Sequence, residues 1–397
     1  MEAILRPDEQ LRVKDLVVRF YTYEGIVKAV EKANLNLKKG ETLGIVGETG
    51  SGKSVTALTI LALTPLPGKV EGGSILFKRI NGKVDDILKL SEEELVKLRG
   101  REISMIFQEP NAALDPLYRV GEQVAEAILS HRLSEMLDRA IESLKEELKN
   151  GNGGFSSKLQ LWAYNEMKKN PDALKLRLVK KLPIIGKIIS RRLNQVVRDE
   201  IIGLLRLMEI PDPERVVDSY PHELSGGMQQ RIVIAIALAC SPLLLLADEP
   251  TTSLDVTVQA QILDLITRLK ERFGASIIYI THDMGVIAEI SDRVAVMYAG
   301  NVVEVAPVIE LFKKPLHPYT KALLEAIPRP GASFKSIPGT VPNLVNPPSG
   351  CRFHPRCPHA MPKCMKEVPE LRRITKEHYV ACHLYGGEGY GKHSDSD

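Results

Sequence analysis

The chain has 397 residues, of which 44% are hydrophobic and 26% are charged. This length and composition predict a folded protein with two domains, or with one domain that carries large additions. Lys and Arg number 53 against 50 Asp and Glu, so the formal net charge of +3 argues against nucleic acid as the main partner.

The sequence predicts no membrane-spanning segment. Residues 1–20 alternate charged and apolar positions, so we expect no signal peptide. The longest apolar stretch, Ile232–Ala247, is interrupted by Ser241 and Pro242 and is too short to cross a bilayer. We therefore expect that this chain cannot form a membrane pore by itself.

Strand-like runs separated by Gly-containing turns dominate the first hundred residues. They predict an N-terminal antiparallel sheet beside a parallel core. The runs are Leu11–Phe20, Val27–Leu37, Glu41–Val46 and Gly73–Phe77.

A complete P-loop follows the apolar run Leu43–Val46. Residues 47–54 read Gly-Glu-Thr-Gly-Ser-Gly-Lys-Ser, and an apolar helical run, Val55–Leu63, comes next. The glycines let backbone N–H groups point at phosphate oxygens, and the helix N-terminus adds partial positive charge. We expect a nucleoside triphosphate here, with Lys53 on the β- and γ-phosphates and Ser54 holding magnesium. The predicted nucleotide-binding residues of this loop are Gly47, Glu48, Thr49, Gly50, Ser51, Gly52, Lys53, Ser54 and Val55.

Helical patterning dominates residues 120–207. Within it, 134–148 reads as an amphipathic helix with Ser134 as its N-cap. Residues 168–198 carry ten basic side chains against the single acid Asp172, with apolar residues interleaved. Two interpretations stay open: an interfacial helix on an anionic membrane leaflet, or a solvated helical hairpin packed on its neighbours.

A second phosphate-binding helix start lies downstream. Leu224-Ser225-Gly226-Gly227-Met228 precedes the apolar helical run Ile232–Cys240. A Ser-Gly-Gly turn that opens a helix offers backbone N–H groups and a helix dipole to an anion, as the P-loop does. We therefore expect Ser225, Gly226 and Gly227 to contact nucleotide.

An acidic pair ends the next predicted strand, Leu243–Leu246. Asp248 can reach the magnesium ion, and Glu249 can polarise the attacking water as general base. Adjacent carboxylates at the end of a buried strand cost desolvation free energy unless a cation compensates them. From residue 243 to 303, strands and helices alternate, which predicts βαβ units and a mostly parallel sheet.

These motifs, in this order, resemble the nucleotide-binding subunits of ABC transporters, whose signature motif is Leu-Ser-Gly-Gly-Gln. Met228 departs mildly from that pattern. The resemblance implies that the signature closes over nucleotide held by the P-loop of a second subunit. It also implies that Ser253-Leu254-Asp255 is the D-loop, and that His282, after Tyr279-Ile280-Thr281, is the switch histidine at the γ-phosphate.

Two further positions come from the same resemblance. Gln108, in Ile106-Phe107-Gln108, matches the Q-loop, which the family uses to touch magnesium and the coupling helix of the permease. Tyr23 lies about where the family stacks an aromatic ring on adenine, and Tyr21 is its rival.

Four of the five cysteines lie in the Pro-rich region after Pro307. In a protein expected on the cytoplasmic side, four clustered thiols argue for a metal before disulfides. No two of them have the close spacing of a zinc site, and the wider spacing suits four thiolates on a cubane iron–sulfur cluster. Zinc, free thiols and disulfides stay open as alternatives. The four residues are Cys351, Cys357, Cys364 and Cys382.

The same region resembles the C-terminal extension of oligopeptide and dipeptide importer ATPases. Leu316-His317-Pro318-Tyr319-Thr320 and the segment from Gly350 to Cys357 carry this likeness. In those ATPases the four cysteines are associated with a [4Fe-4S] cluster. The resemblance spans roughly residues 10–385 and is interrupted by an insertion at about 131–197.

The predicted fold is an α/β P-loop ABC ATPase core with an N-terminal antiparallel β subdomain, an enlarged helical subdomain and a loop-rich cysteine extension. We expect the nucleotide-binding domain at 10–305, with its helical subdomain at about 108–240, and an accessory region at 306–397. Asp255 joins the expected nucleotide contacts through the D-loop.

The resemblance implies an ATPase, using ATP and Mg²⁺, that drives import of dipeptides or oligopeptides. Its implied partners are a second related ATPase in a heterodimer, two permease subunits and an extracellular binding protein. Under the interfacial-helix interpretation, residues 168–198 would also contact anionic lipid. Nucleic acid is not an expected partner. The expected location is peripheral, on the cytoplasmic side of the cell membrane. Import of oligosaccharides or nickel, and a soluble non-transport ABC ATPase, are the alternatives.

Overall fold

The computed structural model describes residues 5–109, 113–169, 183–252, 254–327 and 337–386, with Pro183 and Ile184 described by backbone only. These residues form two compact units. The first unit joins Met1–Gln108 with Pro242–Asp397, and the second unit is Glu109–Ser241. Among the described residues, no helix combines the length and the apolar character needed to cross a membrane.

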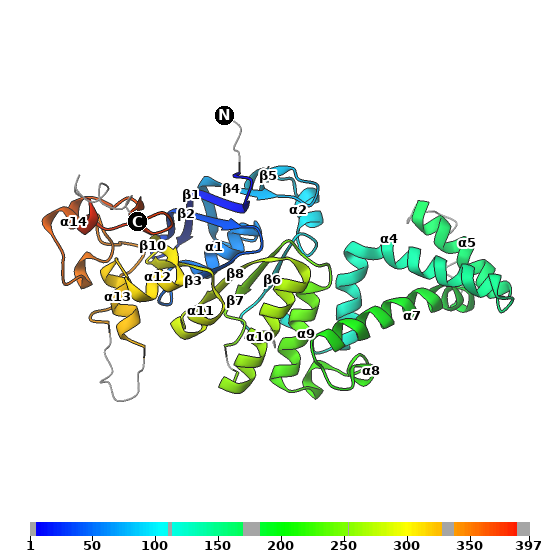
Figure 1. Cartoon of the computed structure of the whole chain (residues 1–397). Coiled ribbons are helices and arrows are strands. Elements are labelled where there is room, and N and C mark those ends of the chain that lie inside the picture. The colour runs from blue at the N-terminus through cyan, green and yellow to red at the C-terminus, as the bar shows by residue number, and fades with distance from the viewer. Residues whose placement is uncertain (1–4, 110–112, 170–182, 253, 328–336, 387–397) are drawn as a thin grey trace. The chain divides into compact units, whose positions relative to one another are not determined.

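The first unit contains the predicted antiparallel sheet, which has four strands in the order β2-β1-β4-β5. In β2 the side chains of Ala33, Leu35 and Leu37 are buried at alternate positions, as a strand with one face on the core requires. In Figure 1 these strands, in blue, lie over α1 and the parallel strands. The strands are β1 (Glu9–Thr22), β2 (Gly25–Lys38), β4 (Gly68–Lys78) and β5 (Val84–Asp86).

A second sheet of eight strands has the order β11-β12-β10-β9-β3-β8-β7-β6. The strands from β9 to β6 pair in parallel, which confirms the predicted parallel sheet, and β10, β11 and β12 pair antiparallel. The central strands β3, β7 and β8 are buried throughout, as expected of a sheet covered on both faces. The strands are β3 (Thr42–Val46), β6 (Ile103–Ile106), β7 (Leu244–Asp248), β8 (Ser276–Thr281), β9 (Arg293–Tyr298), β10 (Asn301–Pro307), β11 (Arg372–Arg373) and β12 (Tyr379–Val380).

The α-helices of the first unit follow or precede these strands. One hydrophobic cluster joins α1 with residues of both sheets, among them Leu11, Leu43 and Ala57. The helices are α1 (Lys53–Ile60), α2 (Glu92–Leu98), α10 (Val256–Phe273), α11 (Met284–Ile290), α12 (Val308–Lys313), α13 (Pro318–Glu325) and α14 (Pro362–Lys366).

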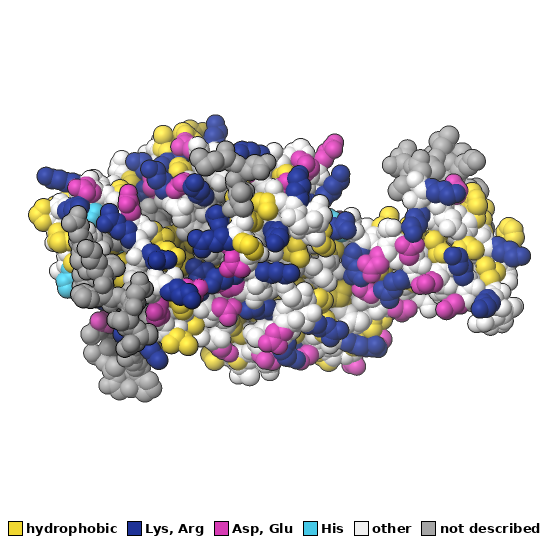
Figure 2. Space-filling view, turned by 45° about the horizontal axis from the view of Figure 1, so that its top comes forward, with side chains coloured by type: hydrophobic (Ala, Val, Ile, Leu, Met, Phe, Trp, Pro, Cys, Tyr) yellow, Lys and Arg dark blue, Asp and Glu magenta, His cyan; other side chains and the backbone are white. Residues whose placement is uncertain are grey.

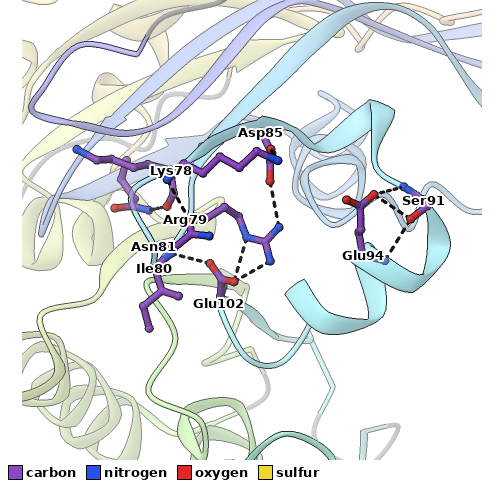
Figure 3. Close-up of polar contacts among 10 residues, drawn as sticks. Lys78, Arg79, Ile80, Asn81, Asp85, Ser91, Glu94 and Glu102 are labelled. Carbon is purple, nitrogen blue, oxygen red and sulfur yellow. Dashed lines mark hydrogen bonds and ion pairs between the residues drawn. The ribbon is translucent and has the colours of Figure 1, made fainter.

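A buried ion pair ties the end of β4 to the residue that precedes β6 (Figure 3). The Nε and Nη2 atoms of Arg79 donate to Oε1 of Glu102 at 2.9 and 2.8 Å, and Nη1 lies 3.2 Å from Asp85. The backbone N–H of Ile80 donates to the other oxygen of Glu102 at 2.9 Å. This network therefore fastens the antiparallel sheet to the edge of the parallel sheet.

The second unit is helical, as predicted from residues 120–207. It contains α4 (Val120–Lys149), α5 (Phe155–Lys169), α7 (Pro183–Leu207), α8 (Pro213–Val216) and α9 (Gly226–Leu238). Figure 1 shows α4 and α7 side by side with α5 at their far end. α4 consists of two helical parts that meet at a kink at Arg132, with φ −116° and ψ 15°, so a helix begins close to the predicted start of 134–148. The prediction of Ser134 as its N-cap is wrong, because Ser134 lies after the kink, inside the second part.

The part of the insertion that the structure describes forms a helical hairpin with its own core. Tyr164 is fully buried there, donates through its hydroxyl to the carbonyl of Ile189, and accepts from the N–H of Leu193 at 2.9 Å. The core side chains are Leu137, Ala140, Ile141, Leu144, Ala163, Tyr164, Met167 and Ile189.

Ion pairs neutralise several of the basic side chains counted in residues 168–198. Lys168 pairs with Asp138, Arg192 pairs with Glu147, and Arg198 pairs with Asp218. Figure 2 shows hydrophobic, basic and acidic side chains mixed over this group of helices. Residues 170–182, which include Asp172, lie outside the described residues.

Candidate functional site

The P-loop is built where β3 ends and α1 begins. A Cβ at Gly47 would lie 2.1 Å from the carbonyl oxygen of Met297, so only glycine fits there. Gly50 and Gly52 have φ angles of +79° and +97°, which are left-handed conformations that glycine adopts without strain. The loop thus takes the shape that lets backbone N–H groups face one anion.

The predicted phosphate-binding lysine is buried against the loop. Its Nζ atom donates to the carbonyl oxygens of Gly47 and Glu48 at 2.7 and 3.2 Å. Burial lowers the pKa of Lys53, and the carboxylates of Glu249, Asp248 and Glu48 act against that shift. A buried ammonium group that rests on carbonyl oxygens is suited to exchange them for phosphate oxygens.

Two of the predicted magnesium ligands, Ser54 and Asp248, lie next to each other. The Oγ of Ser54 donates to Oδ1 of Asp248 at 3.1 Å. Burial raises the pKa of Asp248; the Ser54 hydrogen bond lowers it, and the nearby Glu249 raises it further. A hydroxyl and a buried carboxylate that lacks full charge compensation fit the oxygen ligands that Mg²⁺ prefers.

Three side chains from three parts of the chain converge on the carboxylate of Glu249. His282 Nδ1 lies 3.0 Å from Oε1, while Gln108 Nε2 and Thr252 Oγ1 donate to Oε2 at 3.3 and 3.1 Å. Glu249 itself has φ +46°, which a residue with a side chain rarely adopts. Such an outlier at a polar cluster is typical of a functional site.

The candidate adenine-stacking residues differ in their surroundings. Tyr23, at the turn between β1 and β2, is fully exposed. Tyr21 is engaged, because its hydroxyl donates to Glu71 and Lys69 Nζ lies 5.5 Å from its ring centre. The Glu71 hydrogen bond raises the pKa of Tyr21.

The predicted second anion site lies at the start of α9, in the second unit. Ser225 is the N-cap, and its side chain accepts from the N–H of Met228 at 3.4 Å. Ser225 and Gly226 are exposed, and Gly227 is half-buried, at the start of this helix of 13 residues.

Asp255 has a local structural contact. Its carboxylate accepts from the N–H groups of Thr257 and Val258, both at 3.0 Å, and so caps α10. Ser253, the first residue of the predicted D-loop, lies outside the described residues.

A contact with the P-loop from the C-terminal region was not foreseen from the sequence. Arg356 Nη1 and Nη2 donate to the two carboxylate oxygens of Glu48 at 2.7 and 3.1 Å. The backbone N–H of Glu48 donates to the hydroxyl of Tyr319 at 2.9 Å. No local spacing could reveal the Arg356 pair, because 308 residues separate its members.

The four C-terminal thiols form one neighbourhood, and all four are free. Burial raises the pKa of Cys351 to about 11, with the other three thiols adding to the shift. Burial also raises the pKa of Cys357 and of Cys382. In each of the three thiols a backbone N–H group lowers the pKa: that of Phe353 for Cys351, of His359 for Cys357 and of Leu384 for Cys382. As the described residues are placed, no group of three or more His, Cys, Asp or Glu could hold a metal ion.

Two family profiles match the chain. The profile described as "ABC transporter" matches residues 30–252. The profile described as "Oligopeptide/dipeptide transporter, C-terminal region" matches residues 303–364, which include Cys351, Cys357 and Cys364.

Curated relatives match almost the whole chain. A probable peptide ABC transporter ATP-binding protein of Sinorhizobium fredii is 43% identical over 390 residues, covering 96% of this chain and 97% of the relative. The oligopeptide transport ATP-binding protein of Bacillus subtilis is 42% identical over 382 residues, covering 95% of this chain and 89% of the relative. The oligopeptide transport ATP-binding protein of Escherichia coli is 43% identical over 378 residues, covering 94% of this chain and 93% of the relative.

Solved structures share the fold. A dimeric bacterial ABC transporter cassette is 26% identical with a TM-score of 0.52 and covers 75% of this chain and 98% of its own. A dimeric post-hydrolysis state of an ATP-binding cassette bound to ADP and Pi is 25% identical with a TM-score of 0.51 and covers the same shares.

Proposed function

This chain belongs to the ABC transporter ATP-binding subunits of oligopeptide and dipeptide importers, and we propose that Glu249 is the general base of its ATPase. The family predicted from the motifs is confirmed. The chain is the ATP-hydrolysing subunit of a peptide ABC importer, a function that uses ATP and Mg²⁺.

The convergence of Gln108, Thr252 and His282 on Glu249 is the observation that carries this assignment. Magnesium held by Ser54 and Asp248, with Gln108 nearby, would neutralise phosphate charge. Lys53 and the P-loop N–H groups bind the phosphates, while His282 orients the base and reaches the γ-phosphate. The carboxylate of Glu249 accepts the proton of the attacking water.

Replacing Glu249 by Gln tests the base. Removal of a general base lowers turnover by about 10²-fold or more. We expect the purified transporter with Glu249→Gln to hydrolyse ATP at that reduced rate while ATP stays bound in a closed dimer. Full turnover would contradict the assignment.

We propose that the chain pairs with a second, related ATPase in a head-to-tail heterodimer. The helix start supports this arrangement, because its exposed residues Ser225 and Gly226, followed by Gly227, are open to nucleotide on the partner's P-loop. Asp255 lies at the same interface, and Tyr23 stacks on adenine. The region around Gln108 then transmits closure to two permease subunits, with an extracellular binding protein delivering peptide.

This assembly places the chain at the cytoplasmic side of the cell membrane. Residues 10–305 are the nucleotide-binding part, with 108–240 as its helical part, and 306–397 are the accessory part. Co-purification of the chain with hydrophobic permeases from detergent-solubilised membranes tests the assembly. Recovery as a soluble protein free of permeases would favour a non-transport ABC ATPase.

We propose that the four C-terminal thiols hold a [4Fe-4S] cluster. Backbone N–H groups aimed at three of the sulfurs suit thiolates, which need hydrogen bonds when they are buried. A cubane cluster also joins sulfurs that are too far apart for one ion. The cluster would supply either a structural crosslink or a one-electron redox centre.

The cluster has a direct test. Protein purified without oxygen should be brown, with broad visible absorption and about four iron and four sulfide per chain. The variant Cys364→Ser should lose the visible absorption and the iron and sulfide. Cys240→Ser, which lies outside the group of four, should keep them. One zinc and no iron in the anaerobic protein would contradict the proposal.

A contact between the helical hairpin and anionic lipid is a second proposed role. Phe155 and Trp162 are exposed on one face of α5 together with Lys158 and Lys169, a combination typical of interfacial helices. Trp162 is the only tryptophan, so its fluorescence should shift to shorter wavelength with anionic vesicles and return with salt. An equal shift with neutral vesicles, or none, would remove this role.

A further inference from the structure

Glu48 is the residue of the P-loop that contacts the C-terminal region. Its carboxylate is held by Arg356 and its backbone N–H by Tyr319. Its carbonyl oxygen accepts from Ser51 N–H at 3.1 Å and from Lys53 Nζ at 3.2 Å. Glu48 therefore connects the loop that would receive phosphate to two residues of the C-terminal region.

The Arg356 side chain is 5% exposed, so its guanidinium has given up most of its water. Its remaining contacts are a hydrogen bond from Nε to the carbonyl of Pro338 at 2.8 Å, one from Nη1 to the hydroxyl of Tyr298 at 3.2 Å, and ring contacts with Tyr298 and Phe353. Burial of an arginine is unfavourable unless the guanidinium is paired with an opposite charge and fully hydrogen-bonded. Glu48 supplies the opposite charge, and the two hydrogen bonds fix its direction.

A second arginine of the same short segment supports the loop indirectly. Arg352 donates to the carbonyls of Ala299 and Lys28 and pairs with Glu31 at 3.1 Å. The next residue after Ala299, Gly300, donates its N–H to the carbonyl of Ser51 at 2.9 Å. Both arginines lie in the cysteine segment, residues 351–357. This segment therefore contacts the P-loop directly through Arg356 and supports it through Ala299 and Gly300 from Arg352.

The loop needs such restraints. Gly50 has no heavy atom within 4 Å of where a Cβ would lie, so side-chain packing does not hold the tip of the loop. A glycine-rich loop loses more conformational entropy on ordering than other segments. If the loop is fixed before nucleotide arrives, less of that entropy is lost on binding and affinity rises.

We infer that Arg356 is a positioning residue for ATP binding, which it promotes by fixing the P-loop through Glu48. This inference rests on the nucleotide site proposed above. It gives the C-terminal region of the chain a part in the ATPase site, although Arg356 touches no reacting atom.

Equilibrium titration of the full chain with Mg-ATP tests this inference. Arg356→Ala should raise the Kd by about tenfold, the factor expected for a lost charge-assisted hydrogen bond. In the assembled transporter the KM for ATP should rise similarly, while kcat at saturating ATP should change less than twofold. Arg356→Lys keeps the charge but loses the two-pronged geometry, so its Kd should lie in between.

The matched control is Arg79→Ala, which removes another arginine–glutamate pair in which two guanidinium nitrogens donate to the carboxylate. Neither Arg79 nor Glu102 is among the predicted nucleotide or magnesium contacts. It should lower the melting temperature and leave the Kd for Mg-ATP unchanged. If Arg356→Ala changes only the melting temperature, as the control does, the positioning role is overturned.

A double-mutant cycle separates the pair from general damage. Glu48→Gln alone should raise the Kd about as much as Arg356→Ala, and the double variant should be no worse than the weaker-binding single variant. Additive losses would overturn the inference. Should Arg356→Ala fail to fold, Arg356→Lys and Glu48→Gln carry the same cycle. Absence of ATP binding by the wild-type chain would instead remove the nucleotide site itself.

Discussion

Two partly buried arginine–glutamate pairs of the first unit have almost the same chemistry in different places. Arg79 and Glu102 lie 23 residues apart and join the antiparallel sheet to the edge of the parallel sheet. Arg356 and Glu48 lie 308 residues apart and join the cysteine segment to the P-loop. In each pair, two guanidinium nitrogens donate to the carboxylate.

The two pairs differ in the part of the structure that contains the glutamate. Glu102 accepts a further backbone N–H, that of Ile80, and so completes a joint between two sheets. Glu48 belongs to the loop predicted to bind phosphate, and its own carbonyl contacts Lys53. The same interaction should therefore contribute to folding alone in one region and to ATP affinity in the other.

The largest expected effect is on the structural pair. Arg79→Ala leaves a buried carboxylate without its partner, and we expect the free energy of unfolding to fall by about 3 kcal/mol. Denaturant unfolding followed by circular dichroism measures the loss. A loss below about 1 kcal/mol in the free energy of unfolding would show that the Arg79–Glu102 pair contributes little to stability. The proposed difference in role between the two pairs would then be contradicted.

The next largest effect should be a loss of folding stability at acid pH, caused by His317 in the C-terminal region. Burial, opposed by Glu304 and aided by Lys321, lowers the pKa of His317 from 6.5 to about 4. The folded state keeps this ring neutral while the unfolded state takes up a proton, so stability falls as the pH drops from 6.5 towards 4. Linkage gives a loss of about 2 kcal/mol between pH 6.5 and pH 5.

The variant His317→Asn isolates this contribution. Asparagine can still accept the N–H of Tyr319, as the Nδ1 of His317 does at 3.0 Å, and it does not titrate. Unfolding free energies measured at both pH values should differ less for the variant than for the wild type. Equal slopes would rule His317 out as the source.

A smaller effect should follow from Tyr319→Phe. This change removes the hydroxyl that accepts the N–H of Glu48, and we expect a loss of about 1 kcal/mol in stability. Because that N–H belongs to the P-loop, the Kd for Mg-ATP should also rise a few-fold. An unchanged Kd would confine the C-terminal influence on the loop to Arg356.

The smallest effect should come from an exposed pair of the C-terminal region. Arg372 lies 3.5 Å from Glu370, and both side chains are more than half exposed. Arg372→Ala should change stability by less than about 0.5 kcal/mol and leave ATP binding unchanged. A large loss of ATP affinity would mean that charge in this region, rather than the Arg356 contact, governs the site.

Local patterns predicted the core of the fold and the candidate site. The P-loop, the acidic pair and His282 are short motifs whose flanking strands are visible as apolar runs, and β3, β7 and β8 lie where those runs predict. Alternation of apolar residues likewise predicted β1, β2 and β4, although each strand extends beyond its predicted ends.

Long-range pairing could not be predicted in the same way. Nothing in the spacing of Arg356 connects it with Glu48, and β12 joins β10 across more than seventy residues. The error at Ser134 has a related cause: a good capping residue also fits inside a helix when tertiary packing continues the helix past it.

The measurement that tests the central claim most directly is ATP hydrolysis by the transporter in proteoliposomes with its binding protein. A peptide-loaded binding protein should raise hydrolysis by the wild-type complex and leave the Glu249→Gln complex at its low rate. Stimulation by an oligosaccharide or nickel but not by peptide, or equal hydrolysis by both complexes, would contradict the account.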